Sequence, residues 1–362
     1  MSEDRMTPLN LAIVSQSDTA GGAEAHTAAL GDGLSRRGHA VTLYGKCPGW
    51  ERTGLPRHDI GLGPKWSRST LPYAFLRVPA ERQRVQAVPD ASVYYMQFKR
   101  EQISLTRTLS RKAPVVWTEH GRWMGGAVGR VLARGYEQAA KHVTTVVCVS
   151  DDVAADLAPM VGRDKLAVIP NAIDTDAFTP PAAPKRSELR ARLLPERFQD
   201  RTVAILASRL HSAKQHDRAI AAAERAGVAL VIAGDGPDRP RLEELARGKD
   251  VHFFGFRDDI ADLLAASDLY LFCGAETDGG SAYAVLEAAA CGLPVVSFDG
   301  DPSSDLAPRL GGVKLAEPGQ LTPTVLRRVL DATATGVEYV RKHHSREAWL
   351  DAFEATLREA AR

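Results

Sequence analysis

The amino-acid sequence predicts an α/β protein of two domains, each built on a parallel sheet covered by helices. The chain has 362 residues, which at about 100–200 residues per domain is enough for two. Apolar runs of strand length alternate with amphipathic stretches of helix length. This alternation stops at a proline-rich segment in the middle of the chain and then begins again.

Six apolar runs in the first half are expected to be strands: 9–15, 40–44, 92–96, 115–118, 143–149 and 166–169. The stretch 22–37 predicts a helix that ends at Gly38, because glycine commonly follows the last helical residue. The segment 61–89 carries several basic and aromatic residues without a regular pattern. This segment is expected to lack regular secondary structure. It is either a surface insertion packed on the first domain or a segment that contacts a membrane or an acceptor.

Three prolines, Pro180, Pro181 and Pro184, predict a linker over 175–200. Strands are then expected over 203–208, 229–233, 251–254, 269–273 and 294–298. Helices are expected over 213–226, 239–247, 260–266, 282–291 and, in the charged tail, 337–362. Two such sheets predict a cleft between two domains, with a ligand at the carboxyl ends of the strands.

The composition is that of an ordinary globular protein, with 44% hydrophobic and 25% charged residues. The four cysteines are scattered without a C-x-x-C pair, so neither a zinc site nor a disulfide is expected. No apolar run approaches the length of a membrane span, and the first residues do not resemble a signal peptide. These features favour a cytoplasmic location.

Charge is distributed unevenly, although the net charge is only +1. Residues 1–170 are net basic and residues 171–362 are net acidic. The basic half suits an anionic acceptor or a peripheral membrane contact, and ordinary surface charge is the alternative. Nucleic acid is not expected as a partner.

Gly21 and Gly22 stand between the first expected strand and the first expected helix. Backbone amides can approach a ligand closely at glycine, and a helix amino terminus attracts anions. The segment is neither a G-x-G-x-x-G nor a Walker sequence, so a plain tight turn explains it equally well.

Arg209 follows the first strand of the second half, and Lys214 lies where the next helix is expected to begin. Both are therefore expected at the carboxyl edge of a sheet, where ligands of α/β proteins bind. Two fixed positive charges suit a diphosphate, because arginine offers a planar fork and lysine a point charge. A solvated loop with two unrelated cations is the alternative.

The segment 279–296 combines a glycine pair with a helix of small residues. Gly279, Gly280 and Ser281 precede the helix, so its amino terminus can lie close to a ligand. Glu287 lies in an otherwise apolar stretch, and a buried carboxylate needs partners such as sugar or ribose hydroxyls. A glutamate on the polar face of the helix is the alternative.

Three more segments follow expected strands. Residues 234–237 and the pair Phe256 and Arg257 lie on one predicted edge of the second sheet. His120 follows a strand of the first half, where a structural histidine is commoner than a catalytic one.

Together these segments resemble family 4 of the retaining glycosyltransferases, which has the GT-B fold of two Rossmann-like domains. The resemblance covers nearly the whole chain and depends on the joint order and spacing of its pieces. The pieces are residues 21–24, 149–150, 169–174, 178, 208–210, 214, 233–237 and 286–296. It implies domains over 1–172 and 173–340, with a helix over 341–362 that packs back towards the first domain.

The resemblance also implies roles for individual residues. Arg209 and Lys214 match the pair that neutralises the donor diphosphate. Gly21 and Gly22 match the backbone near the β-phosphate of the donor and the acceptor. Glu287 matches the carboxylate that holds the donor ribose.

Further implied roles concern the transferred sugar and the base. His120 resembles the histidine that contacts the transferred sugar, and Phe256 with Arg257 is expected to line the base pocket. The implied reaction transfers a sugar, with retention, from a nucleotide diphosphate sugar to an unidentified acceptor, with a UDP-sugar as the default donor. Arg209 and Lys214 would stabilise the leaving group, so neither a metal nor another cofactor is expected.

Two positions depart from the family pattern. The acid usually found eight residues before Glu287 is replaced by Gly279, although Glu276 and Asp278 lie just upstream and are candidate replacements. The glycine that usually follows the motif lysine is Gln215. These departures put the identity of the donor sugar in question.

The sequence leaves other functions open. A nucleotide-sugar 2-epimerase of the GT-B fold would bind the same donor without an acceptor. Gly279 motivates a catalytically inactive sugar-nucleotide-binding subunit, although Arg209, Lys214 and Glu287 count against it. An NAD-dependent oxidoreductase is disfavoured, because no G-x-G-x-x-G with a following acid is present.

Overall fold

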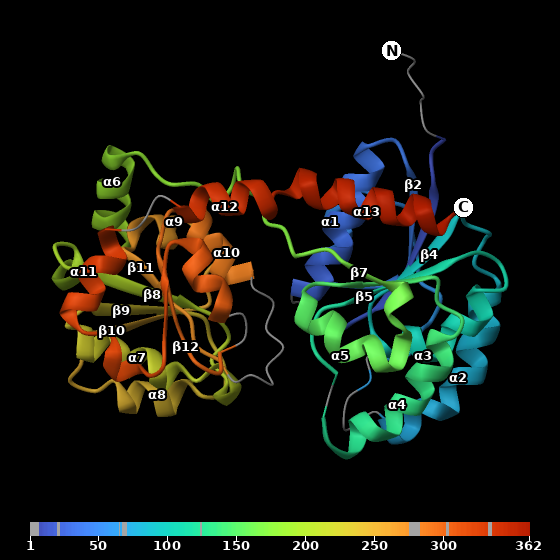
Figure 1. The fold of residues 1–362 in the computed structure, drawn as a ribbon, viewed down its shortest axis with the longest axis horizontal. Coiled ribbons are helices and arrows are strands. Elements are labelled where there is room, and N and C mark those ends of the chain that lie inside the picture. Colours follow the sequence, from blue (N-terminus) through green and yellow to red (C-terminus); the bar gives the residue numbers. More distant parts are fainter. Residues whose placement is uncertain are drawn as a thin grey trace, which may run out of the picture. The chain divides into compact units, whose positions relative to one another are not determined.

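The computed structural model describes residues 7–19, 22–64, 66, 71–123, 125–274, 283–301, 304–331 and 335–362. The chain divides into two compact units (Figure 1). The first unit comprises Met1–Pro170 and Trp349–Arg362, and the second comprises Asn171–Ala348. The sequence predicts the boundaries after residues 172 and 340 instead.

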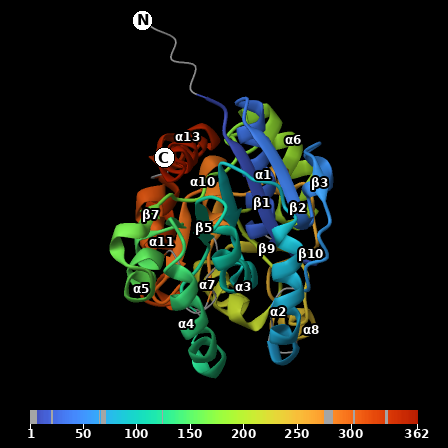
Figure 2. The same cartoon turned by 90° about the vertical axis from the view of Figure 1, so that its right-hand side faces the viewer.

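A parallel sheet lies at the centre of the first unit. In the described part of the chain it has seven strands: β1 (Asn10–Gln16), β2 (Ala40–Lys46), β3 (Arg57–His58), β4 (Val93–Met96), β5 (Val115–Glu119), β6 (Thr145–Cys148) and β7 (Leu166–Val168). The strand order is β3-β2-β1-β4-β5-β6-β7, and Figure 2 shows β1, β2 and β3 side by side. Leu11 on β1 pairs with Val41 on β2 and Val93 on β4, and all three are buried, as expected for a sheet covered on both faces.

Helices follow the strands of the first unit: α1 (Gly22–Arg36), α2 (Leu71–Gln86), α3 (Lys99–Leu109), α4 (Gly126–Ala140) and α5 (Asp151–Val161). The start of α5 shows why the sequence forms a helix there. The Ser150 hydroxyl accepts a hydrogen bond from the Val153 amide at 3.3 Å, and two aspartates follow in the first turn. An oxygen cap and negative charge both stabilise a helix amino terminus.

Helix α2 contradicts the prediction of an irregular segment over 61–89. It contains Pro79, which removes a backbone donor from the helix and obscures the pattern. Contacts with α3 hold it in place: Glu81 is buried, and Nε of Arg82 donates to the Ser104 carbonyl at 2.8 Å. Tertiary packing therefore stabilises a helix that local propensity does not favour.

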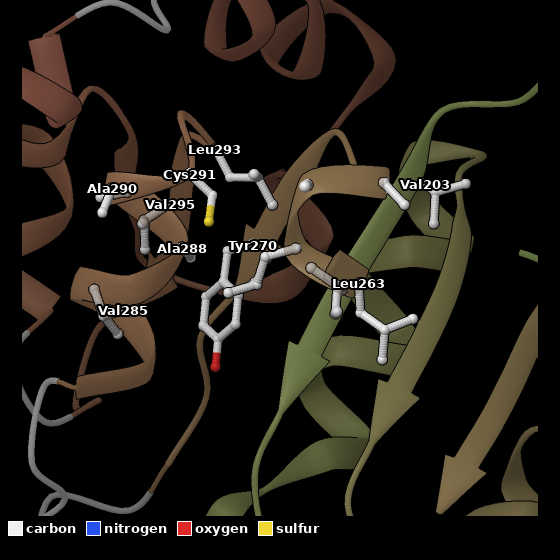
Figure 3. Packing of buried hydrophobic residues seen from close by; sticks show 14 of the residues in the cluster. Val203, Leu263, Tyr270, Val285, Ala288, Ala290, Cys291, Leu293 and Val295 are labelled. Carbon is white, nitrogen blue, oxygen red and sulfur yellow. The ribbon is translucent and has the colours of Figure 1, made fainter. Parts of the chain in front are cut away.

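The second unit is built on another parallel sheet. Its described strands are β8 (Val203–Ala207), β9 (Ala229–Ala233), β10 (Val251–Gly255), β11 (Leu269–Leu271), β12 (Val295–Phe298) and β13 (Val313–Leu315), in the order β10-β9-β8-β11-β12-β13. Tyr270 on β11 packs in a core with Val203, Leu263 and Val295 (Figure 3). Its hydroxyl points along the strand direction and donates to the Ala207 carbonyl at 3.1 Å, at the end of β8.

The helices of the second unit are α6 (Ala183–Leu193), α7 (His216–Ala226), α8 (Arg239–Leu245), α9 (Ile260–Ala266), α10 (Tyr283–Ala290), α11 (Pro323–Asp331) and α12 (Thr335–His343). Helix α6 corrects the prediction of a linker over 175–200. Pro184 lies in its first turn, where a missing N–H costs nothing. Arg186 and Arg190 then pair with Asp268, at 2.6 and 3.0 Å, and hold the helix to the unit.

The last helix, α13 (Arg346–Ala360), lies against α1 of the first unit (Figure 1). The rings of Trp349 and Phe353 meet His26 edge-on, with centroids 5.0 and 5.3 Å apart. Leu350 packs so closely on Gly33 that a Cβ there would lie 2.6 Å from the leucine side chain. The apolar face of α13 is therefore part of the core of the first unit.

The tail is not the single helix that the sequence predicts. Helix α12 ends at His343, and Ser345 forms a parallel bridge with Ile173. The Ile173 amide donates to the His344 carbonyl at 3.0 Å, and Nδ1 of His344 lies 2.7 Å from the Asn171 carbonyl. Pairing with this distant segment takes residues 344 and 345 out of the helical conformation.

Candidate functional site

The order of strands in the second sheet reverses between β8 and β11. Strand β8 pairs with β9, the next strand along the chain, and also with β11. In open α/β sheets such a switch point, at the carboxyl ends of the strands, is where ligands bind. The loops that follow β8 and β11 are therefore the candidate ligand-binding elements of this unit.

The segment after β8 is fixed by the segment after β9. The Ser208 amide donates to the Ala233 carbonyl at 3.0 Å. A Cβ on Gly234 would lie 2.0 Å from the Ser208 carbonyl oxygen, and one on Gly236 would lie 2.2 Å from that of Leu210. These two glycines are thus needed for close backbone packing, and the segment supports the loop after β8.

Arg209 and Lys214, the predicted diphosphate-binding pair, both lie in this loop. The Arg209 side chain is exposed and has no ion pair or hydrogen bond with any residue that the structure describes. Lys214 is partly buried and ends a short 3-10 turn, Ser212–Lys214, ahead of α7. The Arg209 guanidinium is therefore available to an anionic ligand at the switch point.

His216, the first residue of α7, supports this loop and was not singled out in the sequence. Its side chain is fully buried, and Nε2 lies 3.0 Å from the Ser208 hydroxyl. Burial lowers the pKa of His216 to about 4, so the ring is neutral at pH 7. A neutral ring fixes Ser208 without placing a further charge beside Lys214.

Glu287 lies on α10 among buried apolar residues. Its side chain is half-buried, and its carboxylate has no hydrogen bond or ion pair with the described residues. Burial raises the pKa of Glu287 to about 7. Burial, and then the charge of Glu287, raises the pKa of Tyr270, whose hydroxyl bonds to Ala207. Glu287 therefore lies near the end of β8, on the same side as the switch point.

Phe256 and Arg257 follow β10, the outermost strand of the second sheet. The Phe256 side chain is 83% exposed. Arg257 donates to Asp259 through Nε at 2.7 Å and through Nη2 at 2.5 Å. The structure thus places an exposed aromatic ring and a neutralised cation in this loop, and their contact with a base stays a prediction.

In the first unit, His120 follows β5 at the carboxyl edge of the sheet. Its Nε2 lies 3.1 Å from Oε1 of Gln97, which in turn donates from Nε2 to the Ala23 carbonyl at 2.8 Å. Since Ala23 is the second residue of α1, Gln97 connects His120 to the helix end that begins at Gly22. The ring of buried His26 packs edge-on against His120, with centroids 4.7 Å apart. Gly22 and His120 therefore share one edge of the first sheet.

Charged side chains near this edge of the first sheet pair with one another. Lys99 donates to Glu119, at the end of β5. Arg100 lies between Glu101, at 2.7 Å, and Glu81, at 3.4 Å. The Arg100, Glu101 and Glu81 side chains are all buried, so these charges pair with one another inside the unit, although Nε of Arg100 and Oε2 of Glu101 have no hydrogen-bond partner among the described residues.

Several predicted donor-site residues lie outside the described residues: Gly21, Glu276, Asp278, Gly279, Gly280 and Ser281. Among the described residues, no group of three or more histidine, cysteine or acidic side chains is arranged to hold a metal ion. Within the same residues, no helix is both long and apolar enough to cross a membrane. Metal independence stays a prediction.

Two family models match the chain one after the other. The model described as Glycosyltransferase Family 4 matches residues 20–177, and the model described as Glycosyl transferases group 1 matches residues 201–325. The chain belongs to the family 4 type of glycosyltransferases. Both matches together extend over most of the two units.

The names of two curated relatives both contain an inositol compound, and one of them also names a nucleotide sugar. The chain is 36% identical over 169 residues to the GDP-mannose-dependent alpha-(1-6)-phosphatidylinositol dimannoside mannosyltransferase of Mycobacterium tuberculosis, covering 44% of this chain and 42% of that protein. It is 33% identical over 192 residues to the D-inositol 3-phosphate glycosyltransferase of Xylanimonas cellulosilytica, covering 47% and 43%. The matches thus span less than half the length of these relatives.

Solved structures resemble this glycosyltransferase over nearly its whole length. Anabaena HepE in complex with UDP matches with a TM-score of 0.80 and 18% identity, covering 97% of this chain and all of that one. Sucrose-phosphate synthase from Thermosynechococcus elongatus matches with a TM-score of 0.75 and 18% identity, covering 96% and 98%. At these identities the likeness shows the fold, and the predictions of a family 4 glycosyltransferase and of the GT-B fold are confirmed.

Proposed function

We propose that this chain transfers a sugar from a nucleoside diphosphate sugar to a hydroxyl of an acceptor. The bond between the anomeric carbon and the diphosphate oxygen breaks, and the acceptor oxygen forms a new bond to that carbon. Retention means that the acceptor attacks from the face that the diphosphate leaves. The acceptor proton passes to the departing diphosphate, so no side chain has to serve as the base, and direct attack by the acceptor oxygen needs no nucleophile from the protein.

Exposed Arg209 at the switch point is the observation that carries the proposal. As the bond breaks, negative charge develops on the diphosphate, and cations that are already in place stabilise this charge without reorganisation. Arg209 offers a fork of donors and Lys214 a point charge in the same loop. These two charges are proposed to take the place of a metal ion.

Glu287 is proposed to accept hydrogen bonds from the donor ribose. Its half-buried carboxylate has no partner among the described residues, and two hydroxyl donors would offset the cost of burying it. Exposed Phe256 is proposed to contact the base. Uracil is the proposed base, as in the UDP complex of Anabaena HepE.

The acceptor is proposed to bind the first unit, where Gly22 and His120 share an edge of the sheet. Residues 1–170 are net basic, which suits an anionic acceptor. The names of both curated relatives contain an inositol phosphate compound. We therefore propose an acceptor that carries a phosphorylated inositol, either soluble or presented by a membrane surface.

A thermal-shift panel tests the donor assignment. UDP, GDP, ADP, dTDP, their common sugar conjugates and NAD are added in turn, with EDTA present throughout. A ligand that binds only the folded state raises the unfolding midpoint, so UDP and one UDP-sugar are expected to do so. If GDP raises the unfolding midpoint and UDP does not, the base of the donor is guanine rather than uracil. No shift with any nucleotide sugar, or a shift with NAD alone, contradicts the proposed transferase.

Product analysis separates the transferase from its alternatives. The stabilising donor is incubated alone, with inositol phosphate, and with vesicles that contain phosphatidylinositol. A transferase releases nucleoside diphosphate in step with a glycosylated acceptor. A nucleotide-sugar epimerase converts the donor alone, and an inactive binding subunit changes neither compound.

A further inference from the structure

A buried carboxylate outside the predicted site connects three segments at the carboxyl edge of the second sheet. Asp301 follows β12 and is 5% exposed. Its Oδ2 accepts from the Phe298 amide at 2.7 Å, and its Oδ1 accepts from the Gly274 amide at 3.2 Å. Oδ1 also accepts from Nη1 of Arg218 on α7 at 2.6 Å. One side chain thus ties the chain after β11 and the end of β12 to α7.

Arg218 extends this connection to the loop that carries Lys214. Its Nη1 also donates to Oε1 of Gln215 at 3.1 Å, and its Nη2 donates to the Asp299 carbonyl at 3.2 Å. Gln215 directly follows Lys214 and has φ 45° and ψ 43°. This left-handed conformation favours glycine, so a glutamine here is strained. The bond from Arg218 fixes the Gln215 side chain and offsets part of that strain.

The connection is charged and mostly shielded from solvent. Arg218 faces Asp301 from α7, and Asp299 approaches it from the turn after β12. The Arg218 guanidinium also lies 5.0 Å from the centroid of the Phe298 ring. Burial raises the pKa of Asp301 to about 6, which leaves it largely ionised at pH 7, so the ion pair with Arg218 is intact there.

We propose that Arg218 and Asp301 are positioning residues for the donor diphosphate. They act through Gln215 and Gly274, which they hold in place relative to each other. Gln215 directly follows Lys214 and sets its position, and Gly274 follows β11 at the switch point of the sheet. This inference rests on the proposed function, because it assigns a role within the same site.

Asp268 provides a matched control at the opposite edge of the same sheet. Its Oδ2 accepts from the Val203 amide at 2.7 Å, where β8 begins. Its carboxylate pairs with Arg186 at 2.6 Å and with Arg190 at 3.0 Å. Asp268 therefore joins a strand to a neighbouring helix by the same kinds of bond, but remote from the switch point.

The test compares Asp301→Asn with Asp268→Asn well below the unfolding midpoint of each variant. Asp268→Asn is expected to lower the midpoint, because it loses two ion pairs, whereas Asp301→Asn also removes the cost of burying an ionised carboxylate, so its midpoint should change less. Only Asp301→Asn is expected to weaken binding of the nucleoside diphosphate that stabilises the wild type, by about tenfold, the scale of one hydrogen bond to a charged group. Equal dissociation constants in the two variants overturn the positioning role and leave the proposed function standing. A wild type that binds none of UDP, GDP, ADP and dTDP overturns both.

Arg218→Lys tests the same connection by changing the partner of Asp301. It replaces the first test if Asp301→Asn does not fold. Lysine keeps the charge beside Asp301 but cannot donate to Asp301, Gln215 and the Asp299 carbonyl together. Binding of the same nucleoside diphosphate is expected to weaken by about tenfold. Adding Gln215→Gly to this variant removes the backbone strain. The double variant is expected to bind the nucleoside diphosphate roughly threefold more tightly than Arg218→Lys alone. A double variant that binds no better than Arg218→Lys overturns the link through Gln215.

Discussion

Among the described residues, the carboxyl edge of the first sheet holds a buried group of paired charges, whereas the edge of the second sheet holds unpaired charges beside the Asp301–Arg218 pair. In the first unit, Arg100 lies buried between Glu101 and Glu81, and each charge has a partner inside the unit. In the second unit, Arg209 is exposed and Glu287 is half-buried, and neither pairs with a described residue. The two units thus share an architecture but place charge differently at equivalent edges.

We propose that this difference separates charges that stabilise the fold from charges that bind the donor. A buried pair is costly to break from one side, because the remaining charge is poorly solvated. A lone carboxylate at a sheet edge is itself a cost to the fold, as the raised pKa of Glu287 indicates. Substitutions of Arg100 and its partners are therefore expected to change the stability of the fold. Substitutions of Arg209 or Glu287 are expected to change ligand binding or turnover.

Arg100→Met is expected to have the largest effect. It leaves two carboxylates buried without their cation, which costs about 3–5 kcal/mol of unfolding free energy. Denaturant unfolding measures this loss. The matched control is Arg107→Met, because Arg107 is an exposed arginine on the same helix. This control is expected to change stability by less than about 0.5 kcal/mol. Equal stability of both variants would mean that the pairing at the first edge carries little energy.

Arg209→Ala and Lys214→Ala are each expected to reduce turnover by about 100-fold or more, the scale of losing one charge that stabilises a transition state. Stability should change little for Arg209→Ala, since the side chain is exposed. Arg247→Ala is the control, because that arginine is 77% exposed in the same unit and pairs with Glu244. Turnover within about threefold of the wild type in both test variants contradicts the diphosphate assignment.

Glu287→Gln is expected to have a smaller effect that depends on pH. The pKa of Glu287 rises from 4.5 to about 7 on folding, so the fold favours the protonated form and is destabilised as pH rises through 7. Glutamine removes that penalty, so the variant should be more stable than the wild type at pH 8, by about 2 kcal/mol, and equally stable below pH 4.5.

Donor affinity should move in the opposite direction in this variant. The wild type is expected to bind the nucleoside diphosphate more weakly as pH falls through 7, whereas Glu287→Gln is weak throughout. Titrations at pH 6 and pH 8 measure both trends. If Glu287→Gln is less stable than the wild type at pH 8 and binds the nucleoside diphosphate equally well, then Glu287 stabilises the fold and does not bind the donor.

The sequence predicted the features that depend on local pattern. Arg209, Lys214 and Glu287 stand beside apolar runs that mark strand ends and a helix, so their elements were visible. Arg218 and Asp301 were not visible, because they are 83 residues apart and meet only through the order of strands in the sheet. Helices α2 and α6 were missed for another reason: both contain proline, and tertiary contacts stabilise them where local propensity does not.

The first unit is completed by residues that follow the second unit in the chain. Trp349, Leu350 and Phe353 on α13 cover one face of α1. On the ribosome, which releases the amino end first, that face stays open until the entire second unit has been made. The unit translated first is therefore the unit that finishes folding last. A premature stop just ahead of Trp349 would spare the second sheet and damage the core of the first unit.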